Sequence, residues 1–544
     1  MNRTFAIAAL LAVLLSLSGC GGGEGSGSPQ PPGGGNNPPP PLDTTPDDFA
    51  FDPAGIIEGH AGQHVFLSAK VTGFEGELTG KVSDRACTRS TPGVCPFVEL
   101  SRNGEGGGGD SVTLAAGDTL DVHMVVNSDA VIGETFEATV TVGEGEGAKS
   151  ASIKVTVPDR EPPALAVHFP PAKSITQAAR IHVRGTVADD GVIKSVKVGD
   201  VAAELDSTAG TWRAEVDLVS GSNIITVIAT DEAGKTGKRS ISMDTTSTTA
   251  GSGEPVPSSI QASEVSPDGL SVFYGGADHT VYKLDLETGQ RTVLSREPDA
   301  GSGPAIGFLR GMTIGRSDGE LLVANHEQVV AVDMTNGDRT SLSNDRGKGS
   351  GPVFNAMDVT TDSSSGTVYV ASGESDNKVY SIALPSGDRT IVSDATTGTG
   401  PVIGDIESIT IDESTGNLFV SGEASLDNYV VFKIDPATGN RSVASAGAGP
   451  VLGSLPEARY WEEEGVVLVA DAHNAALIKM DPATGDRSVV SGPTVGQGTG
   501  LYSLNSFALH APSRVAFVVS DEEGIYRIYA VDLESGDRVV VAAD

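Results

Sequence analysis

The feature that most constrains this chain is a segment that recurs six times in its C-terminal half. Each copy has apolar residues, then approximately Asp-x-x-Thr-Gly-Asp-Arg, then apolar residues again, which is the pattern of strand, tight turn and strand. The glycine allows a positive φ in the turn, and the Asp and Thr side chains can satisfy its free amides. The turn glycines lie about 46 to 52 residues apart, at Gly289, Gly337, Gly387, Gly439, Gly485 and Gly536. This period predicts one four-stranded sheet per copy, and a six-bladed β-propeller over residues 258–544.

A second repeated piece lies between these hairpins, for example at residues 366–371, 416–421 and 465–470. We expect these pieces to be inner strands that are apolar on both faces, because neighbouring blades cover them. The sixth hairpin, at 528–542, has no inner strands after it, and the inner strands at 260–274 have no outer hairpin before them. The sequence therefore predicts a last blade built from both ends of this region, which would remove free sheet edges.

Two short stretches resemble known propeller families. The segment Val-Ser-Pro-Asp-Gly-Leu-Ser-Val-Phe at 265–273 resembles the repeat of TolB-like propellers, and the later Val-Ala-Asp pieces resemble NHL and regucalcin or gluconolactonase-type propellers. Regucalcin-like lactonases use a divalent ion at the channel mouth to polarise a carbonyl group. This resemblance implies a metal-dependent lactonase or hydrolase as one possible activity.

The innermost strands place polar residues near the predicted channel mouth. Aligning them brings together Gln261, Arg310, Met357, Glu407, Pro456 and Asn505, with Asp358 and Glu457 one residue away in register. Short loops that open to the same face carry further polar side chains. The candidate ligand-binding residues are Arg310, Glu407, Asn505, Asp471, His473 and Asp521. The glycine-rich Gly-x-Gly-Pro loops, such as 301–304 and 349–352, are interpreted as structural crossovers.

The N-terminal half predicts two β-sandwich modules, because it consists of short runs of alternating polarity separated by turn residues. The first module covers residues 48–158 and contains Cys87 and Cys95, which are close in sequence and predict a disulfide in an exported protein. The second covers 159–246, and a linker follows at 247–257. Its segments 181–189 and 221–234 resemble bacterial Ig-like modules, which usually act as spacers or adhesive units. Asp189, Asp190 and Asp231 could share a calcium ion there, since calcium takes hard oxygen ligands.

The N-terminus has the features of an export signal. A positive residue, Arg3, precedes an apolar run at 5–15, which predicts a signal peptide over 1–19. The run ends in Leu-Ser-Gly-Cys, which resembles the lipobox of bacterial lipoproteins. That resemblance implies that Cys20 is acylated, with chains such as palmitate, and anchors the protein in a membrane. Residues 20–47 then form a tether rich in Gly and Pro, which we expect to be disordered. In many Gram-negative bacteria, an aspartate directly after the lipidated cysteine retains a lipoprotein at the inner membrane. This chain has Gly21 there, so we expect the outer membrane if the organism is Gram-negative.

The net charge and the absence of certain motifs argue against several classes of function. The formal net charge of −36 repels the phosphate backbone, so nucleic acid is not an expected partner. The sequence has no Gly-x-Ser-x-Gly elbow, His-Glu-x-x-His helix or Walker loop. We therefore expect an all-β, lipid-anchored protein of the cell envelope. Its Ig-like spacers would project a propeller that binds a protein or glycan without catalysis, and the alternative is the lactonase-type hydrolase.

Overall fold

The computed structural model describes residues 45–52, 55–88, 97–105, 109–374, 376–426, 428–453 and 457–544. The predicted signal peptide, Cys20, most of the tether, Cys95 and Pro456 lie outside these residues, so the lipid anchor and the Cys87–Cys95 disulfide stay predictions. The described part is almost entirely β-structure, with two single-turn 3-10 segments, η1 (Gly145–Gly147) and η2 (Ala511–Ser513). The expectation of an all-β chain is confirmed. No helix within the described ranges is long and apolar enough to cross a membrane.

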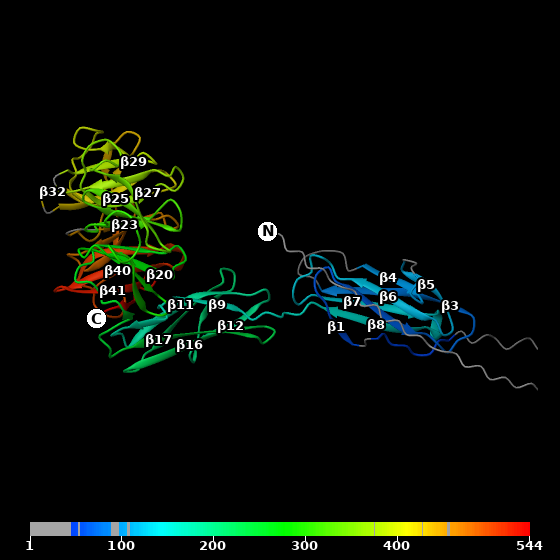
Figure 1. Cartoon of the computed structure of the whole chain (residues 1–544). Helices are drawn as coiled ribbons and strands as arrows, with labels where there is room; N and C mark the ends of the chain where they lie inside the picture. The colour runs from blue at the N-terminus through cyan, green and yellow to red at the C-terminus, as the bar shows by residue number, and fades with distance from the viewer. Residues whose placement is uncertain are drawn as a thin grey trace, which may run out of the picture. The chain divides into compact units, whose positions relative to one another are not determined.

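The chain divides into two compact units, the first ending at Val157 and the second beginning at Pro158. The first unit contains two sheets (Figure 1). In sheet order, the larger has β1 (Ile56–Glu58), β8 (Lys149–Thr156), β7 (Thr135–Val142), β3 (Glu77–Thr88) and β5 (Ser111–Ala115). The smaller has β2 (His64–Lys70), β6 (Thr119–Val125) and β4 (Phe97–Arg102).

Alternating polarity explains why these strands form a sandwich. In β2, β6 and β7 every second residue is buried, so each strand presents one apolar face. The buried side chains of both sheets, including Leu67, Leu100, Val122 and Phe136, belong to one core. Two one-faced sheets thus bury their apolar sides against each other, as the period-two pattern predicts.

The second unit begins with another pair of sheets. One consists of β14 (Glu204–Asp206), β15 (Thr211–Asp217), β11 (Arg180–Ala188) and β9 (Ala164–Phe169). The other contains β13 (Val201–Ala202), β12 (Ile193–Val198), β16 (Ser222–Asp231), β17 (Thr236–Asp244) and β10 (Lys173–Ile175). Between them lie Phe169, Ile181, Trp212 and Val227, all buried. We call this part the second sandwich.

Six groups of four antiparallel strands follow, which we call repeat sheets 1 to 6; a short fifth strand extends the first, and the sixth is part of a nine-stranded sheet. Sheet 1 has β19 (Ala262–Val265), β20 (Ser271–Gly275), β21 (Val281–Asp285) and β22 (Gln290–Ser295). Sheet 2 has β23 (Gly311–Ile314), β24 (Glu320–Asn325), β25 (Gln328–Asp333) and β26 (Arg339–Asn344). Sheet 3 has β27 (Ala356–Thr361), β28 (Val368–Ser372), β29 (Lys378–Ala383) and β30 (Asp388–Ser393). Sheet 4 has β31 (Gly404–Ile411), β32 (Leu418–Ser425), β33 (Asn428–Ile434) and β34 (Arg441–Val443). Sheet 5 has β35 (Glu457–Trp461), β36 (Val466–Asp471), β37 (Ala476–Met480) and β38 (Arg487–Ser491). Sheet 6 has β39 (Ser503–His510), β40 (Val515–Glu522), β41 (Ile525–Asp532) and β42 (Arg538–Ala542).

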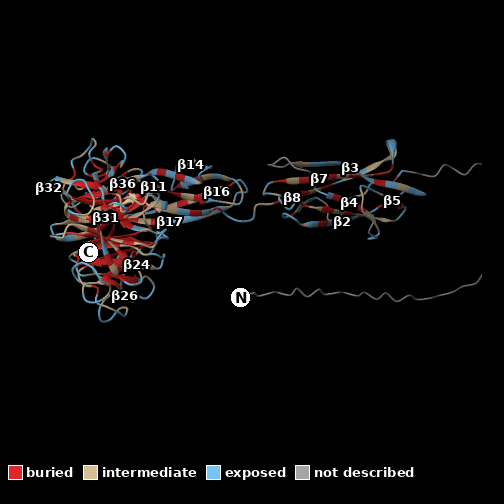
Figure 2. Ribbon diagram, turned by 90° about the horizontal axis from the view of Figure 1, so that it is seen from above, coloured by how far each residue is buried: buried red, intermediate tan, exposed pale blue. Residues whose placement is uncertain are grey.

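The first strand of each repeat sheet contacts the first strand of the next. These contacts join β19 to β23, β23 to β27, β27 to β31, β31 to β35 and β35 to β39, and β39 in turn contacts β19. Ser263 of β19 and Ser506 of β39 share a hydrogen bond of 2.8 Å between their hydroxyl groups. The second strands, such as β24 and β36, are buried along almost their whole length, as Figure 2 shows. The expectation of inner strands that are apolar on both faces is confirmed.

The predicted pairing of the last blade is wrong. Sheet 6 consists entirely of C-terminal strands, and sheet 1 is already complete with β19 to β22. The inner strands β39 and β40 were not predicted, and they supply the missing half of sheet 6. The outer edges pair elsewhere: β10 of the second sandwich pairs with β42, and β18 (Ser252–Gly253), within the predicted linker, pairs with β22.

The pairing of β10 makes the second sandwich continuous with sheet 6, in one nine-stranded sheet. Charged side chains reinforce this junction. Arg184 of β11 forms a buried ion pair with Asp532 and donates a hydrogen bond of 2.8 Å to the carbonyl of Arg514. The His182 imidazole lies 2.8 Å from the buried carboxylate of Asp537. The second sandwich is therefore attached to sheet 6 by backbone and side-chain bonds.

Candidate ligand-binding site

A polar pocket of about 140 Å³ lies where the first strands of all six repeat sheets begin. Its lining includes five of the six residues predicted for the channel mouth, namely Gln261, Arg310, Met357, Glu407 and Asn505. Asp358 and Glu457, the neighbours in register, line it as well. The alignment of inner strands therefore located residues that the fold brings together, because equivalent positions in successive sheets face the same centre.

Arg310 lies at one side of the pocket and is held by several contacts. Its guanidinium donates to Nε2 of His326 at 3.1 to 3.2 Å, and it lies 3.3 Å from the carboxylate of Glu374. It also lies over the ring of Phe308, 4.8 Å from the centroid. Since Nε2 of His326 accepts these bonds, its Nδ1 carries the proton and donates to Asn355. These contacts fix the direction in which Arg310 presents its charge.

Glu407 supplies a carboxyl group with an unusual proton affinity. Burial raises its pKa to about 7, and the negative charges of Asp405, Glu374 and Glu423 act in the same direction, while Arg310 opposes them. At neutral pH this side chain can accept a hydrogen bond or donate one. That property suits the recognition of hydroxyl groups or of a proton-transfer partner.

A buried charge network lies beside the pocket, around Arg459 of β35. Arg459 forms ion pairs with Glu457 and with Asp358, the latter at 3.1 Å, and donates to the carbonyl of Met312 at 3.2 Å. The other carboxylate bonds go to backbone amides: Ile409 donates to Asp358 at 3.0 Å, and Phe507 donates to Glu457 at 2.9 Å. These bonds connect sheets 2 to 6 with one another.

The network has three carboxyl groups, those of Glu264, Asp358 and Glu457, against the one guanidinium group of Arg459. Burial raises the pKa of Glu264 to about 7, with a further contribution from Asp358, although Arg459 lowers it. Burial also raises the pKa of Asp358 and of Glu457 above their ordinary values. One oxygen of Asp358 and the amide oxygen of Asn505 are buried without a hydrogen-bond partner. The pocket therefore offers unsatisfied acceptors to a ligand.

Arg459 was not among the predicted site residues. Its position could have indicated it, because it is a charged residue inside a short inner strand, two residues after Glu457, and such strands are otherwise largely apolar. A buried arginine needs anionic partners, and Arg459 finds them in Glu457 of its own strand and in Asp358 of β27.

The loop residues predicted as ligands are not in this pocket. Asp471 is fully buried and accepts bonds from the amides of Gly453 and Asn474, at 2.7 and 2.9 Å. Asp521 accepts a bond from the amide of Gly524 at 2.6 Å, and His473 is exposed. None of the three lines the pocket; Asp471 and Asp521 instead hold turns.

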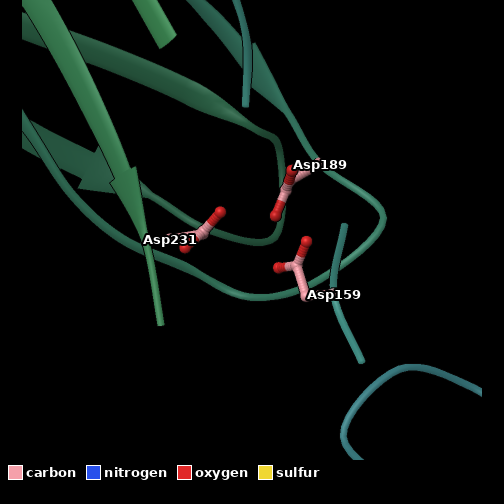
Figure 3. A group of neighbouring side chains, drawn as sticks. All are labelled: Asp159, Asp189 and Asp231. Carbon is pink, nitrogen blue, oxygen red and sulfur yellow. The ribbon is translucent and has the colours of Figure 1, made fainter. Parts of the chain in front are cut away.

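The predicted calcium ligands fall in the second sandwich and require one correction. Asp189 and Asp231 each offer a carboxylate oxygen within 4.8 Å of the other, and the third member of the group is Asp159 (Figure 3). Asp190 is exposed and does not belong to the group. Asp159 was not among the predicted ligands, because nothing local in the sequence indicates that its segment turns toward the ends of β11 and β16. In the described part of the chain, this is the group of three acidic, His or Cys side chains whose geometry could hold a metal ion.

The comparisons with known proteins cover parts of the chain. Residues 163–246 match the family model of glucodextranase, domain B. This match supports the prediction of a β-sandwich at that position. A stretch of 165 residues, 30% of this chain, is 36% identical to Bacillopeptidase F from Bacillus subtilis (strain 168), and it covers 11% of that protein.

Two solved structures are similar over longer stretches. A chain of the nidogen/laminin complex has 14% identity and a TM-score of 0.39, covering 49% of this chain and 90% of that one. A structural genomics protein of unknown function from Bacteroides thetaiotaomicron VPI-5482 has 13% identity and a TM-score of 0.31, covering 80% of this chain and 96% of that one. At these TM-scores neither similarity bears on fold or function.

Proposed function

We propose that the six repeat sheets form a six-bladed β-propeller that acts as a non-enzymatic binding module for a protein or glycan. Two Ig-like sandwiches would project it from a lipid anchor on Cys20, in the cell envelope. The cyclic order of contacts between first strands, including β39 with β19, supports the closed ring. The period of the repeat supports six blades.

The pocket at the start of the first strands carries the binding proposal. It combines a guanidinium group, two amide side chains and three carboxyl groups, which are donors and acceptors suited to hydroxyl-rich or polar ligands. Asp471 does not line the pocket, because its carboxylate accepts hydrogen bonds from the backbone amides of Gly453 and Asn474. The group of three metal-competent carboxylates lies in the second sandwich, and none of the three lines the pocket.

A glycan microarray probed with the full chain tests this function. We expect binding to one class of glycan, weakened about tenfold or more by Arg310→Ala or Asn505→Ala, because each removes polar groups from the pocket. Arg346→Ala is the matched control, since this arginine is 78% exposed and pairs at the surface with Glu327. Binding that both pocket variants leave unchanged would contradict a role for the pocket.

The hydrolase alternative has a separate readout. Lactone hydrolysis is followed in a pH-stat with Ca²⁺, Mn²⁺ or Zn²⁺ present. Turnover that Glu407→Gln abolishes would replace the binding proposal with metal-assisted hydrolysis.

The anchor is tested by mass spectrometry of protein purified from membranes. The wild-type chain should carry acyl groups on an N-terminal Cys20, and Cys20→Ser should be released into the soluble fraction, because its hydroxyl group does not replace the lipobox thiol. An unmodified N-terminus at another residue would contradict the anchor.

A further inference from the structure

Three aspartates from separate parts of the chain meet at one end of the second sandwich. Asp159 lies in the segment between β8 and β9, Asp189 directly follows β11, and Asp231 is the last residue of β16. Figure 3 shows their carboxylates directed toward one another, and one oxygen from each lies within 4.8 Å of the others.

Each carboxylate has one buried oxygen without a hydrogen-bond partner. The unpartnered, buried atoms are Oδ1 of Asp159, Oδ1 of Asp189 and Oδ2 of Asp231. Asp231 is fully buried, and the side chain of Asp159 is only 6% exposed. Isolated charges at such depth are costly, so buried carboxylates are normally paired or coordinate a metal.

Backbone amides hold the other oxygens and so set the direction of the free ones. The amide of Lys235 donates to Oδ1 of Asp231 at 2.8 Å, and the amide of Gly191 donates to Oδ2 of Asp189 at 3.2 Å. Gly191 also allows the close approach of Asp159, because a Cβ atom at this position would lie 2.4 Å from Oδ2 of Asp159. The orientation is therefore a property of the fold.

One cation is nearby. Nζ of Lys235 lies 3.7 Å from Oδ1 of Asp159 and donates to the backbone carbonyl of the same residue. A single lysine against three carboxylates leaves two negative charges without a counter-charge.

We propose that Asp159, Asp189 and Asp231 bind one calcium ion, which ties the segment before β9 to the ends of β11 and β16. All the free ligand atoms are carboxylate oxygens, which calcium prefers, whereas structural zinc sites use Cys and His. Calcium–oxygen bonds of about 2.3–2.6 Å allow two ligand oxygens of one ion to lie up to about 5 Å apart. The oxygens of the cluster all lie within 4.8 Å of one another, so one calcium ion can contact all three carboxylates. This site does not depend on the function proposed for the repeat sheets.

Calorimetric titration of the chelator-treated full chain with CaCl₂ tests the assignment. We expect one site with a Kd below about 1 mM, the weak limit of extracellular calcium modules. Asp189→Asn and Asp231→Asn should each weaken binding about tenfold or more, because they remove a charged ligand but keep the acceptor for the backbone amide. Asp190→Asn is the matched control, since it removes the adjacent, exposed carboxylate outside the cluster.

A second measurement separates metal binding from a structural role. With EDTA, Asp189→Asn should raise the Tm, because it removes repulsion between like charges. With calcium, the Tm of the wild type should rise because the ion binds the folded state, whereas the Tm of the variant should rise little. An equal fall in Tm under both conditions would mean that Asp189 only supports the turn, and would overturn the proposal. So would the absence of wild-type binding, equal binding by Asp189→Asn, or tighter binding of MgCl₂ than of CaCl₂.

Discussion

The arginine of the repeated turn connects neighbouring repeat sheets, and Arg389 shows how. Its Nε donates to the carbonyl of Pro352 at 2.7 Å, and its Nη1 donates to Oγ of Ser343 at 2.8 Å and to the carbonyl of Asn344 at 3.0 Å. The guanidinium also lies 4.9 Å from the ring centroid of Phe354. All these partners precede Arg389 by 35 residues or more, in β26 and the Gly-x-Gly-Pro loop after it.

The same connection recurs along the chain. In four successive Gly-x-Gly-Pro loops, the backbone carbonyl of the proline accepts a hydrogen bond of 2.7 to 2.8 Å from the Nε atom of a turn arginine. These arginines are Arg339, Arg389, Arg441 and Arg487. This supports the structural interpretation of these loops. Arg389→Ala should therefore loosen the attachment of sheet 3 to sheet 2.

The magnitude follows from the bonds that are lost. A hydrogen bond from a charged donor contributes about 1.5–3 kcal/mol to stability. The three bonds of Arg389 given above are 2.7, 2.8 and 3.0 Å long. Water can reach part of the vacated space and such losses are not additive, so we expect a net loss of about 3–5 kcal/mol in the free energy of unfolding. Arg389→Lys should lose most of this amount, because an ammonium group cannot supply the planar fork of donors.

Urea unfolding of the full chain, followed by far-UV circular dichroism, measures this loss as a lower midpoint of the transition that involves the repeat sheets. Arg346→Ala, which removes a side chain that is 78% exposed, should change the free energy by about 1 kcal/mol or less. A loss for Arg389→Ala that is no greater than this control would refute the reasoning that the repeated arginine links the sheets.

Two further predictions concern buried charges. Because the folded pKa of Glu407 is about 7 and an unfolded glutamate titrates near 4.5, the folded state binds more protons between these values. Glu407 should therefore lower stability as the pH rises from about 4.5 to 7, by at most about 3 kcal/mol, and Glu407→Gln should reduce this dependence in melting curves at stepped pH; identical curves would contradict it. Arg184→Ala should destabilise the second unit by about 3–5 kcal/mol, since it leaves Asp532 buried without its cation. Calorimetric melting would show this, whereas Arg213→Ala, at a 62% exposed surface pair, should have almost no effect.

Local chemistry accounts for what the sequence analysis predicted correctly. In the first repeated turn, Oδ1 of Asp285 accepts bonds from the amides of Glu287 and Thr288, at 3.1 and 2.7 Å, and Gly289 has a φ of 71°. These interactions lie within five residues, so the hairpin follows from the motif alone. The burial of alternate residues in β2 and of nearly all residues in β20 likewise follows from the polarity pattern.

The pocket was partly predictable for the same reason. Gln261, Arg310 and Asn505 occupy equivalent positions in similar repeats, so a period in the sequence becomes a common location in space. Asp471 lies outside this pocket, because residue type does not reveal whether a carboxylate faces a pocket or backbone amides such as those of Gly453 and Asn474.

The sequence by itself determined the elements of this protein: the strands, the turns between them and the sixfold repeat, because each depends on residues that are close along the chain. Only the tertiary structure decided which distant groups meet. It pairs β10 with β42, surrounds Arg459 with acids from other strands, and turns Asp159 toward Asp189 and Asp231. Such contacts depend on how whole sheets pack and on where buried charges can find partners, and no short-range pattern carries that information.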